Sequence, residues 1–158
     1  MARVLVYGYG NPGRLDDGLG PALVDELAAR GVGDDVALET GYQLQVEDAA
    51  LVAPFDLVIF ADAHATCAPP FELRELAPRH GADFTTHSLA PEAVLALARD
   101  LYGSRARGFT LGIRGCHFDD YGERLSPLAR RHLDAAADFL RQALRDGTGD
   151  LRCPSPGR

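Results

Sequence analysis

Short unbroken apolar runs alternate along this chain with segments of helical periodicity. The apolar runs predict β-strands at 3–8, 36–39, 56–61, near 70–74 and 108–113. Apolar residues that recur every three or four positions predict helices at 20–30, 43–52, 91–99 and 126–144. Alternating strands and helices, with strands that are apolar on both faces, predict a mostly parallel sheet covered on both sides.

The expected fold is a single-domain α/β protein: a twisted, mostly parallel β-sheet of about five strands sandwiched between helices. A chain of 158 residues suits one domain of ordinary size. We expect this domain to span 1–145, with Ser126 and Pro127 capping and starting its last helix. From 146 to 158 the sequence turns to Gly, Pro, Thr and Ser without periodicity, which predicts a mobile C-terminal tail.

The turn between the first strand and the first helix, Gly8–Gly20, carries two adjacent carboxylates, Asp16 and Asp17. In an open α/β sheet such a turn lies at the carboxyl ends of the strands, where ligands bind. Aspartates are rarely buried without a partner. We therefore do not expect the buried core to hold this pair.

The glycines of the same turn allow a different interpretation. Gly8, Gly10 and Gly13 satisfy the dinucleotide-binding pattern G-x-G-x-x-G, and Glu39 ends a strand where a ribose-binding acid would stand. That pattern holds pyrophosphate on free backbone amides, whereas here two carboxylates would repel the anion and Pro12 removes one amide. Dinucleotide binding is therefore disfavoured.

Three chemically capable side chains follow predicted strands or precede a predicted helix: Asp17, Asp62 and His87. In a doubly wound sheet the first and third strands flank the switch point, so Asp17 and Asp62 are expected to face each other there. Two carboxylates and one imidazole can ligate a divalent transition metal or share acid–base catalysis.

Each candidate has a simpler alternative role. Asp17 could cap the following helix, and His87, in a turn rich in Thr and Ser, could be a surface or capping side chain. His64 lies two residues after Asp62 and could be a fourth ligand. His117 is expected to be exposed to solvent.

The composition limits the classes of molecule that this protein is expected to bind. The formal net charge is −7, and all 16 basic residues are scattered arginines, which argues against nucleic-acid binding. No apolar run approaches the ~20 residues of a membrane span, and no signal segment stands at the N-terminus, so neither a membrane partner nor export is expected. Cys67, Cys116 and Cys153 are far apart and suit free thiols in a cytoplasmic protein.

Several short motifs, taken in their order and spacing over about 3–145, resemble the hydrogenase maturation proteases. They are Gly-x-Gly-Asn and Asp-Asp-Gly-x-Gly within 8–20, Ala-Asp-Ala at 61–63, Thr-x-His ending at His87, Leu-Tyr-Gly at 101–103, Gly-Ile-Arg-Gly at 112–115 and Gly-Glu-Arg-Leu-Ser-Pro at 122–127.

The resemblance implies a cytoplasmic endopeptidase of the aspartic type that removes the C-terminal extension of a nickel–iron hydrogenase large-subunit precursor after nickel insertion. It implies no tightly bound cofactor, because the nickel arrives inside the substrate. The family's catalytic and nickel-contacting positions fall on Asp17, Asp62 and His87.

Substrate binding is expected at Gly10, Asn11 and Gly41, with a tight turn as the alternative role of the loop glycines.

Three positions depart from the family pattern. The first acid, Asp17, is often Glu in relatives; 40–44 reads Thr-Gly-Tyr-Gln-Leu where Gly-Gly-Thr is commoner; and His64 replaces a small apolar residue. The identity of the cognate hydrogenase is therefore left open.

Two other functions remain compatible with the residues. One is a hydrolase that holds its own zinc through Asp17, Asp62 and His87, with His64 in reserve. The other is a non-catalytic module that binds nickel or the precursor. Metal content separates the first from the protease, and the intact mass of the partner separates the second.

Overall fold

The computed structural model describes residues 2–80, 89–147 and 151. Five strands form one sheet in the order β2-β1-β3-β5-β4. They are β1 (Val4–Tyr9), β2 (Val36–Gly41), β3 (Leu57–His64), β4 (Phe71–Leu76) and β5 (Arg107–Arg114). Only β4 runs antiparallel to its neighbour, which confirms the expected mostly parallel, five-stranded α/β sheet.

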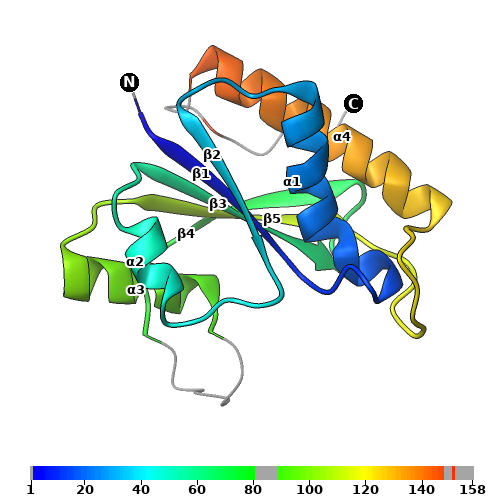
Figure 1. Ribbon diagram of the computed structural model, residues 1–158, viewed down its shortest axis with the longest axis horizontal. Coiled ribbons are helices and arrows are strands. Elements are labelled where there is room, and N and C mark those ends of the chain that lie inside the picture. Colours follow the sequence, from blue (N-terminus) through cyan, green and yellow to red (C-terminus); the bar gives the residue numbers. More distant parts are fainter. Residues whose placement is uncertain (1, 81–88, 148–150, 152–158) are drawn as a thin grey trace.

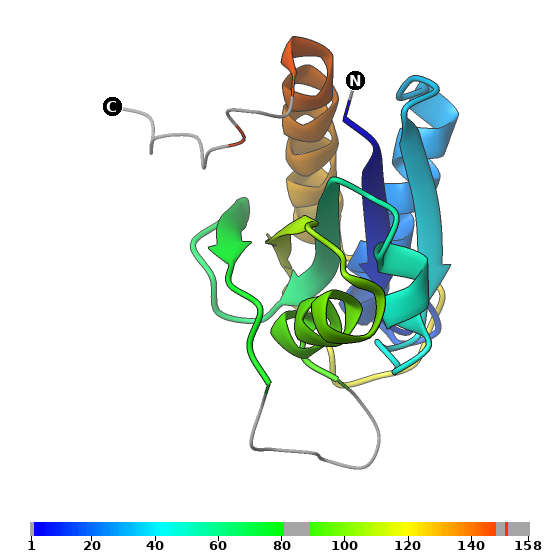
Figure 2. The same cartoon turned by 90° about the vertical axis from the view of Figure 1, so that its left-hand side faces the viewer.

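Two layers of helices enclose the sheet (Figure 1). On one side lie α1 (Leu19–Arg30) and α4 (Pro127–Asp146), and on the other α2 (Asp48–Val52) and α3 (Pro91–Tyr102). The turned view in Figure 2 also shows α2 and α3 side by side. Within the described ranges, no helix combines the length and apolar character that crossing a bilayer requires.

Alternation along each strand divides the core between the two faces. Val4 and Val6 of β1 pack on the α1 and α4 side, whereas Leu5 and Tyr7 pack on the α2 and α3 side. This is why the central strands read as unbroken apolar runs. Leu151, beyond the last helix, is also buried in the core on the α4 side.

The observed boundaries refine the expected ones. The second helix begins at Asp48 rather than at 43, and the Asp48 carboxylate accepts a hydrogen bond from the Gln45 N–H (2.8 Å). Ser126 caps α4 as predicted, because its Oγ accepts from the Ala129 N–H at 3.2 Å. Helix α4 ends at Asp146, one residue past the predicted domain end.

The connections create a switch point between β1 and β3. From β1 the chain passes through α1 to β2 on one side, and then through α2 to β3 on the other side of β1. The two central strands pair in parallel, with Tyr7 opposite Phe60 and Gly8 opposite Ala61. The loop after β1 and the end of β3 therefore meet at the edge where such sheets bind ligands.

Candidate functional site

The loop after β1 turns sharply at Gly10. Its φ is +141°, and a Cβ there would overlap the Asp17 carbonyl oxygen, so only glycine fits. The Gly10 N–H donates to the Gly41 carbonyl at 3.0 Å. These two predicted substrate-binding residues thus bond to each other at the sheet edge.

Asp17 lies in a short 3₁₀ helix, η1 (Leu15–Gly18), and is half-buried. Its Oδ2 accepts a hydrogen bond from the Asn11 N–H at 3.0 Å, while the Asn11 side chain accepts from the Gly13 N–H at 2.9 Å. Helix α1 is preceded by Gly18 and has no side-chain cap. The alternative that Asp17 caps this helix is therefore wrong, and the loop holds its carboxylate instead.

Asp62 lies on β3, two residues before that strand ends at His64, so the strand is longer than predicted. The pKa of Asp62 is raised to about 7, mainly by burial and also by the nearby Asp17 carboxylate, while a hydrogen bond from the Ala63 N–H opposes the shift. Asp17 and Asp62 thus interact electrostatically. Near neutral pH the Asp62 carboxyl exists in both protonation states, which suits acid–base catalysis.

A cavity of about 180 Å³ lies beside Asp62 on the α3 face of the sheet. Its polar lining consists of Tyr9, Asp62, His64, Glu72, Arg74 and Thr110. Burial and the carboxylates of Asp62 and Glu92 raise the pKa of Tyr9, so its hydroxyl stays protonated and available as a donor. The sequence interpretation missed Tyr9, although its place at the end of the first strand was a usable signal.

The His64 ring is held in place by hydrogen bonds from the backbone. Its Nδ1 accepts hydrogen bonds from the Thr66 N–H (3.1 Å) and the Cys67 N–H (2.9 Å). The neutral ring therefore carries its proton on Nε2, and the Nδ1 lone pair is not free for a metal ion.

Asp16 is fully buried whereas Asp17 is half-buried, so the core holds one of the two carboxylates and not both. It accepts four hydrogen bonds of 2.8–2.9 Å, from the N–H groups of Cys116, His117 and Ser126 and from the Ser126 hydroxyl. Although burial opposes it, these donors lower the pKa of Asp16. The donors lie in a distant segment, so nothing near Asp16 in the sequence announced this role.

The remaining predicted histidines have different outcomes. His87 lies outside the described residues, and its role stays a prediction. His117 is exposed, as expected. Across 2–80, 89–147 and 151, no three His, Cys, Asp or Glu side chains are grouped closely enough to hold a metal ion.

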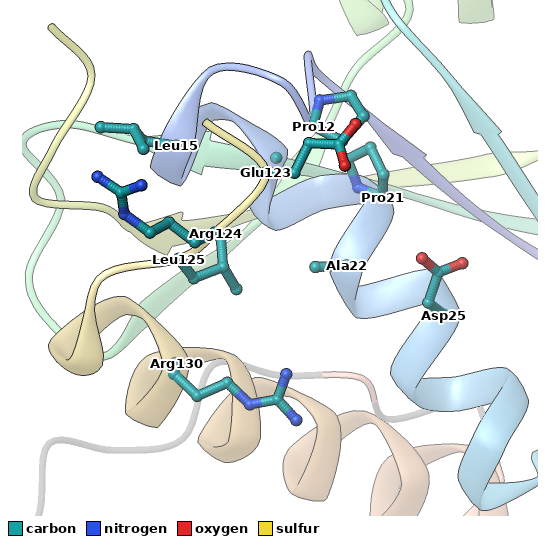
Figure 3. Close-up of a pocket in the computed structure, with 10 residues that line it drawn as sticks. Pro12, Leu15, Pro21, Ala22, Asp25, Glu123, Arg124, Leu125 and Arg130 are labelled. Atoms are coloured by element: carbon teal, nitrogen blue, oxygen red, sulfur yellow. The ribbon is translucent and has the colours of Figure 1, made fainter. Parts of the chain in front are cut away.

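A larger cavity, of about 530 Å³, is lined by the loop that carries Asp17 and by residues of α1 and α4 (Figure 3). Pro12 and Leu15 of this loop form one wall, and Ala22 and Asp25 of α1 form another. Arg130 of α4 closes the space. Nothing in the local sequence pattern indicated this cavity, because its walls come from two stretches that are distant in sequence, 12–25 and 123–130.

Fold and site together define an α/β protein with two interacting carboxylates at the switch point of its sheet. No protein-family model matches the sequence, and no curated protein matches it by sequence. Solved structures with the same fold include hydrogenase maturation proteases that match nearly the whole chain.

The maturation protease HycI from Thermococcus kodakarensis KOD1 has a TM-score of 0.71 and 23% identity, over 91% of this chain and 93% of its own. The hydrogenase 2 maturation peptidase from a Thaumarchaeota archaeon has a TM-score of 0.66 and 27% identity, over 90% and 97%. The maturating endopeptidase HybD from E. coli has a TM-score of 0.69 and 23% identity, over 93% and 94%. The resemblance inferred from the motifs is thus confirmed as a shared fold.

Proposed function

We propose that this protein is an endopeptidase that removes the C-terminal extension of a nickel–iron hydrogenase large-subunit precursor once nickel has been inserted. The observation that carries the proposal is the fold, which this chain shares over 91% of its length with a hydrogenase maturation protease. The interacting pair Asp17 and Asp62 supports it, because the pair lies where such sheets bind their ligands.

In this proposal the nickel belongs to the substrate. Asp17, Asp62 and His87 would complete the coordination shell of the precursor's nickel, since carboxylate oxygens and imidazole nitrogens both bind divalent transition metals. Asp17 is suited to this role because the Asn11 N–H fixes one of its oxygens. A precursor without nickel would lack this contact and dock poorly.

Asp62 is our candidate general base. A carboxylate at this position can accept a proton from the attacking water and return it to the leaving amine. As the water loses its proton, its oxygen adds to the scissile carbonyl carbon. The carbon–nitrogen bond then breaks, and a carboxylic acid and an amine are released. With Asp62 as the base, the enzyme would be an aspartic-type protease that needs no metal of its own.

The loop residues Gly10, Asn11 and Gly41 stay our candidates for substrate binding. The N–H groups of Gly10 and Asn11 are already hydrogen-bonded within the protein, which favours shaping of the site as the main contribution of the loop. Substrate contacts at these residues would then use the remaining carbonyl and side-chain groups.

The decisive experiment measures the intact mass of a cognate large-subunit precursor, with and without nickel, after incubation with this protein. Loss of a C-terminal peptide only from the nickel-loaded precursor is the expected result. A nickel-loaded precursor that forms a complex but keeps its mass would contradict the protease and identify a non-catalytic binding module. Measuring the metal content of the purified protein tests the zinc hydrolase separately.

A further inference from the structure

Two cavities adjoin the loop that carries Asp17, and Asp62 lines neither of them. The cavity of about 530 Å³ shown in Figure 3 and a second one of about 560 Å³ share Leu15, Arg124 and Leu125 as lining residues. Each volume lies within the range that binding sites commonly have. They therefore adjoin each other at these residues, and we call the two together the path.

The walls of this path are fastened to the candidate site. The Leu15 N–H donates to the Gly122 carbonyl at 3.0 Å, and the Gly122 N–H donates to the Gly13 carbonyl at 2.8 Å. Asp16 accepts hydrogen bonds from both ends of the segment 116–126. A chain bound along the path would therefore be held in a fixed position relative to Asp17.

Arg124 lies where the two cavities meet, and its side chain is exposed. Within the described part of the chain its guanidinium forms no ion pair or hydrogen bond, whereas Arg130 in the same cavity bonds to Glu26 at 3.1 Å. A Cβ at Gly122 would lie 3.2 Å from Nη1 of Arg124, so this glycine leaves room for the guanidinium.

The surrounding charges limit what can bind beside Arg124. The carboxylates that line the two cavities are Asp25, Asp119, Asp120 and Glu123. They would repel a second anion, so the path suits a polypeptide with a single carboxylate at the position of Arg124. Arginine pairs with carboxylates through two parallel hydrogen bonds, which also fixes their orientation.

We propose that this path binds the part of the precursor beyond the scissile bond, in extended form, with one of its carboxylates on Arg124. The inference rests on the proposed function. A protease that removes a C-terminal extension meets a substrate whose removed part always ends in a carboxylate. Gripping that part on the outer side of the Asp17 loop would leave the inner side, towards Asp62, for the scissile bond.

Steady-state kinetics on the nickel-loaded precursor test the path itself. Arg124→Ala should raise KM about tenfold and leave kcat unchanged, because it removes binding that does not change during the reaction. Arg124→Lys should recover part of this loss. Ala22→Trp, which fills the cavity of about 530 Å³, should also raise KM, whereas Ala29→Trp, on an exposed position of the same helix, should not. Thermal unfolding followed by circular dichroism verifies that each variant is folded.

A competition experiment identifies the occupant. A synthetic peptide with the sequence of the removed extension should inhibit the wild type competitively and should inhibit Arg124→Ala about tenfold more weakly. Amidating its C-terminus tests the terminal carboxylate as the group on Arg124, and amide replacements of its acidic side chains test the others.

The outcomes separate this inference from the proposed function. If the wild type cuts the precursor while both Arg124→Ala and Ala22→Trp keep its KM, the path is not a substrate site. If KM rises but the extension peptide does not compete in an Arg124-dependent way, the path holds the body of the precursor, and the assigned occupant is wrong. A wild type that leaves nickel-loaded precursor uncut overturns the proposed function and this inference with it.

Discussion

Asp16 and Ser126 are separated by 110 positions in the sequence and joined by two hydrogen bonds. The Ser126 N–H donates to Oδ1 and the Ser126 hydroxyl to Oδ2, each at 2.8 Å. Ser126 also caps α4 by accepting from the Ala129 N–H. One buried carboxylate therefore fastens the start of the last helix to the loop that presents Asp17.

Replacing Asp16 by Asn should destabilise the fold. An amide nitrogen in place of one carboxylate oxygen would face an N–H or O–H donor, and the charge that strengthens all four bonds would be lost. We expect the free energy of unfolding to fall by about 2–4 kcal/mol in urea titrations at pH 7. Asp119→Asn, in the same loop but exposed, is the control and should change it by less than about 0.5 kcal/mol. A stability equal to that of the control would mean that the four bonds contribute little.

The titration of Asp62 should make the protein less stable at higher pH. Its pKa is about 7 in the folded state against an ordinary value of 3.8, so ionising this carboxyl opposes folding. The contribution of Asp62 to stability therefore decreases as the pH rises from about 4 through 7. Asp62→Asn should abolish this decrease and be more stable than the wild type at pH 8 by roughly 2–4 kcal/mol, with allowance for partial exposure.

Urea unfolding of the wild type and Asp62→Asn at pH 5 and pH 8 measures this effect. Asp25→Asn, at an exposed position on α1, is the matched control. Equal stability differences between Asp62→Asn and the wild type at the two pH values would contradict a raised pKa.

Helix α1 approaches the two central strands so closely that Gly20 cannot carry a side chain. A Cβ there would overlap the Tyr9 carbonyl oxygen and lie 2.6 Å from the Ala61 carbonyl oxygen, and both neighbours are backbone. Gly20→Ala should therefore lower the free energy of unfolding by about 3 kcal/mol or more. Ala28→Ser, which adds one atom on the exposed face of α1, is the control. A Gly20→Ala protein with the same melting temperature as the wild type would show that the helix can shift without loss of stability.

The proposed catalytic residues should be needed for activity and not for folding. Asp17→Ala, Asp62→Ala and His87→Ala should each lower the processing rate of nickel-loaded precursor by at least about 100-fold. Asp34→Ala, at an exposed position just before the start of β2, is the control and should process the precursor at the normal rate. Intact-mass time courses measure the rates, and circular dichroism verifies the fold. Normal processing by all three variants would place the active site elsewhere.

The apolar pattern predicted every strand and α-helix of the described chain to within a few residues, except that the second helix is shorter than expected; the short 3₁₀ helix η1 was not predicted. Periodicity works here because the sheet is covered on both faces, so each central strand had to be apolar throughout. The pattern also indicated that Asp17 and Asp62 meet at the switch point, since parallel strands end at a common edge.

The tertiary structure separates the surroundings of two adjacent aspartates. Asp16 and Asp17 are chemically identical and consecutive, yet one is buried under four donors from 116–126 and the other stays beside Asp62. The hydrogen bonding of His64 likewise depends on the turn that follows it, because two backbone N–H groups of that turn donate to its Nδ1. The sequence determined the elements, because burial on both faces imposes a local pattern. The partners of buried polar groups come from segments that are distant in sequence, so only the folded chain assigns them.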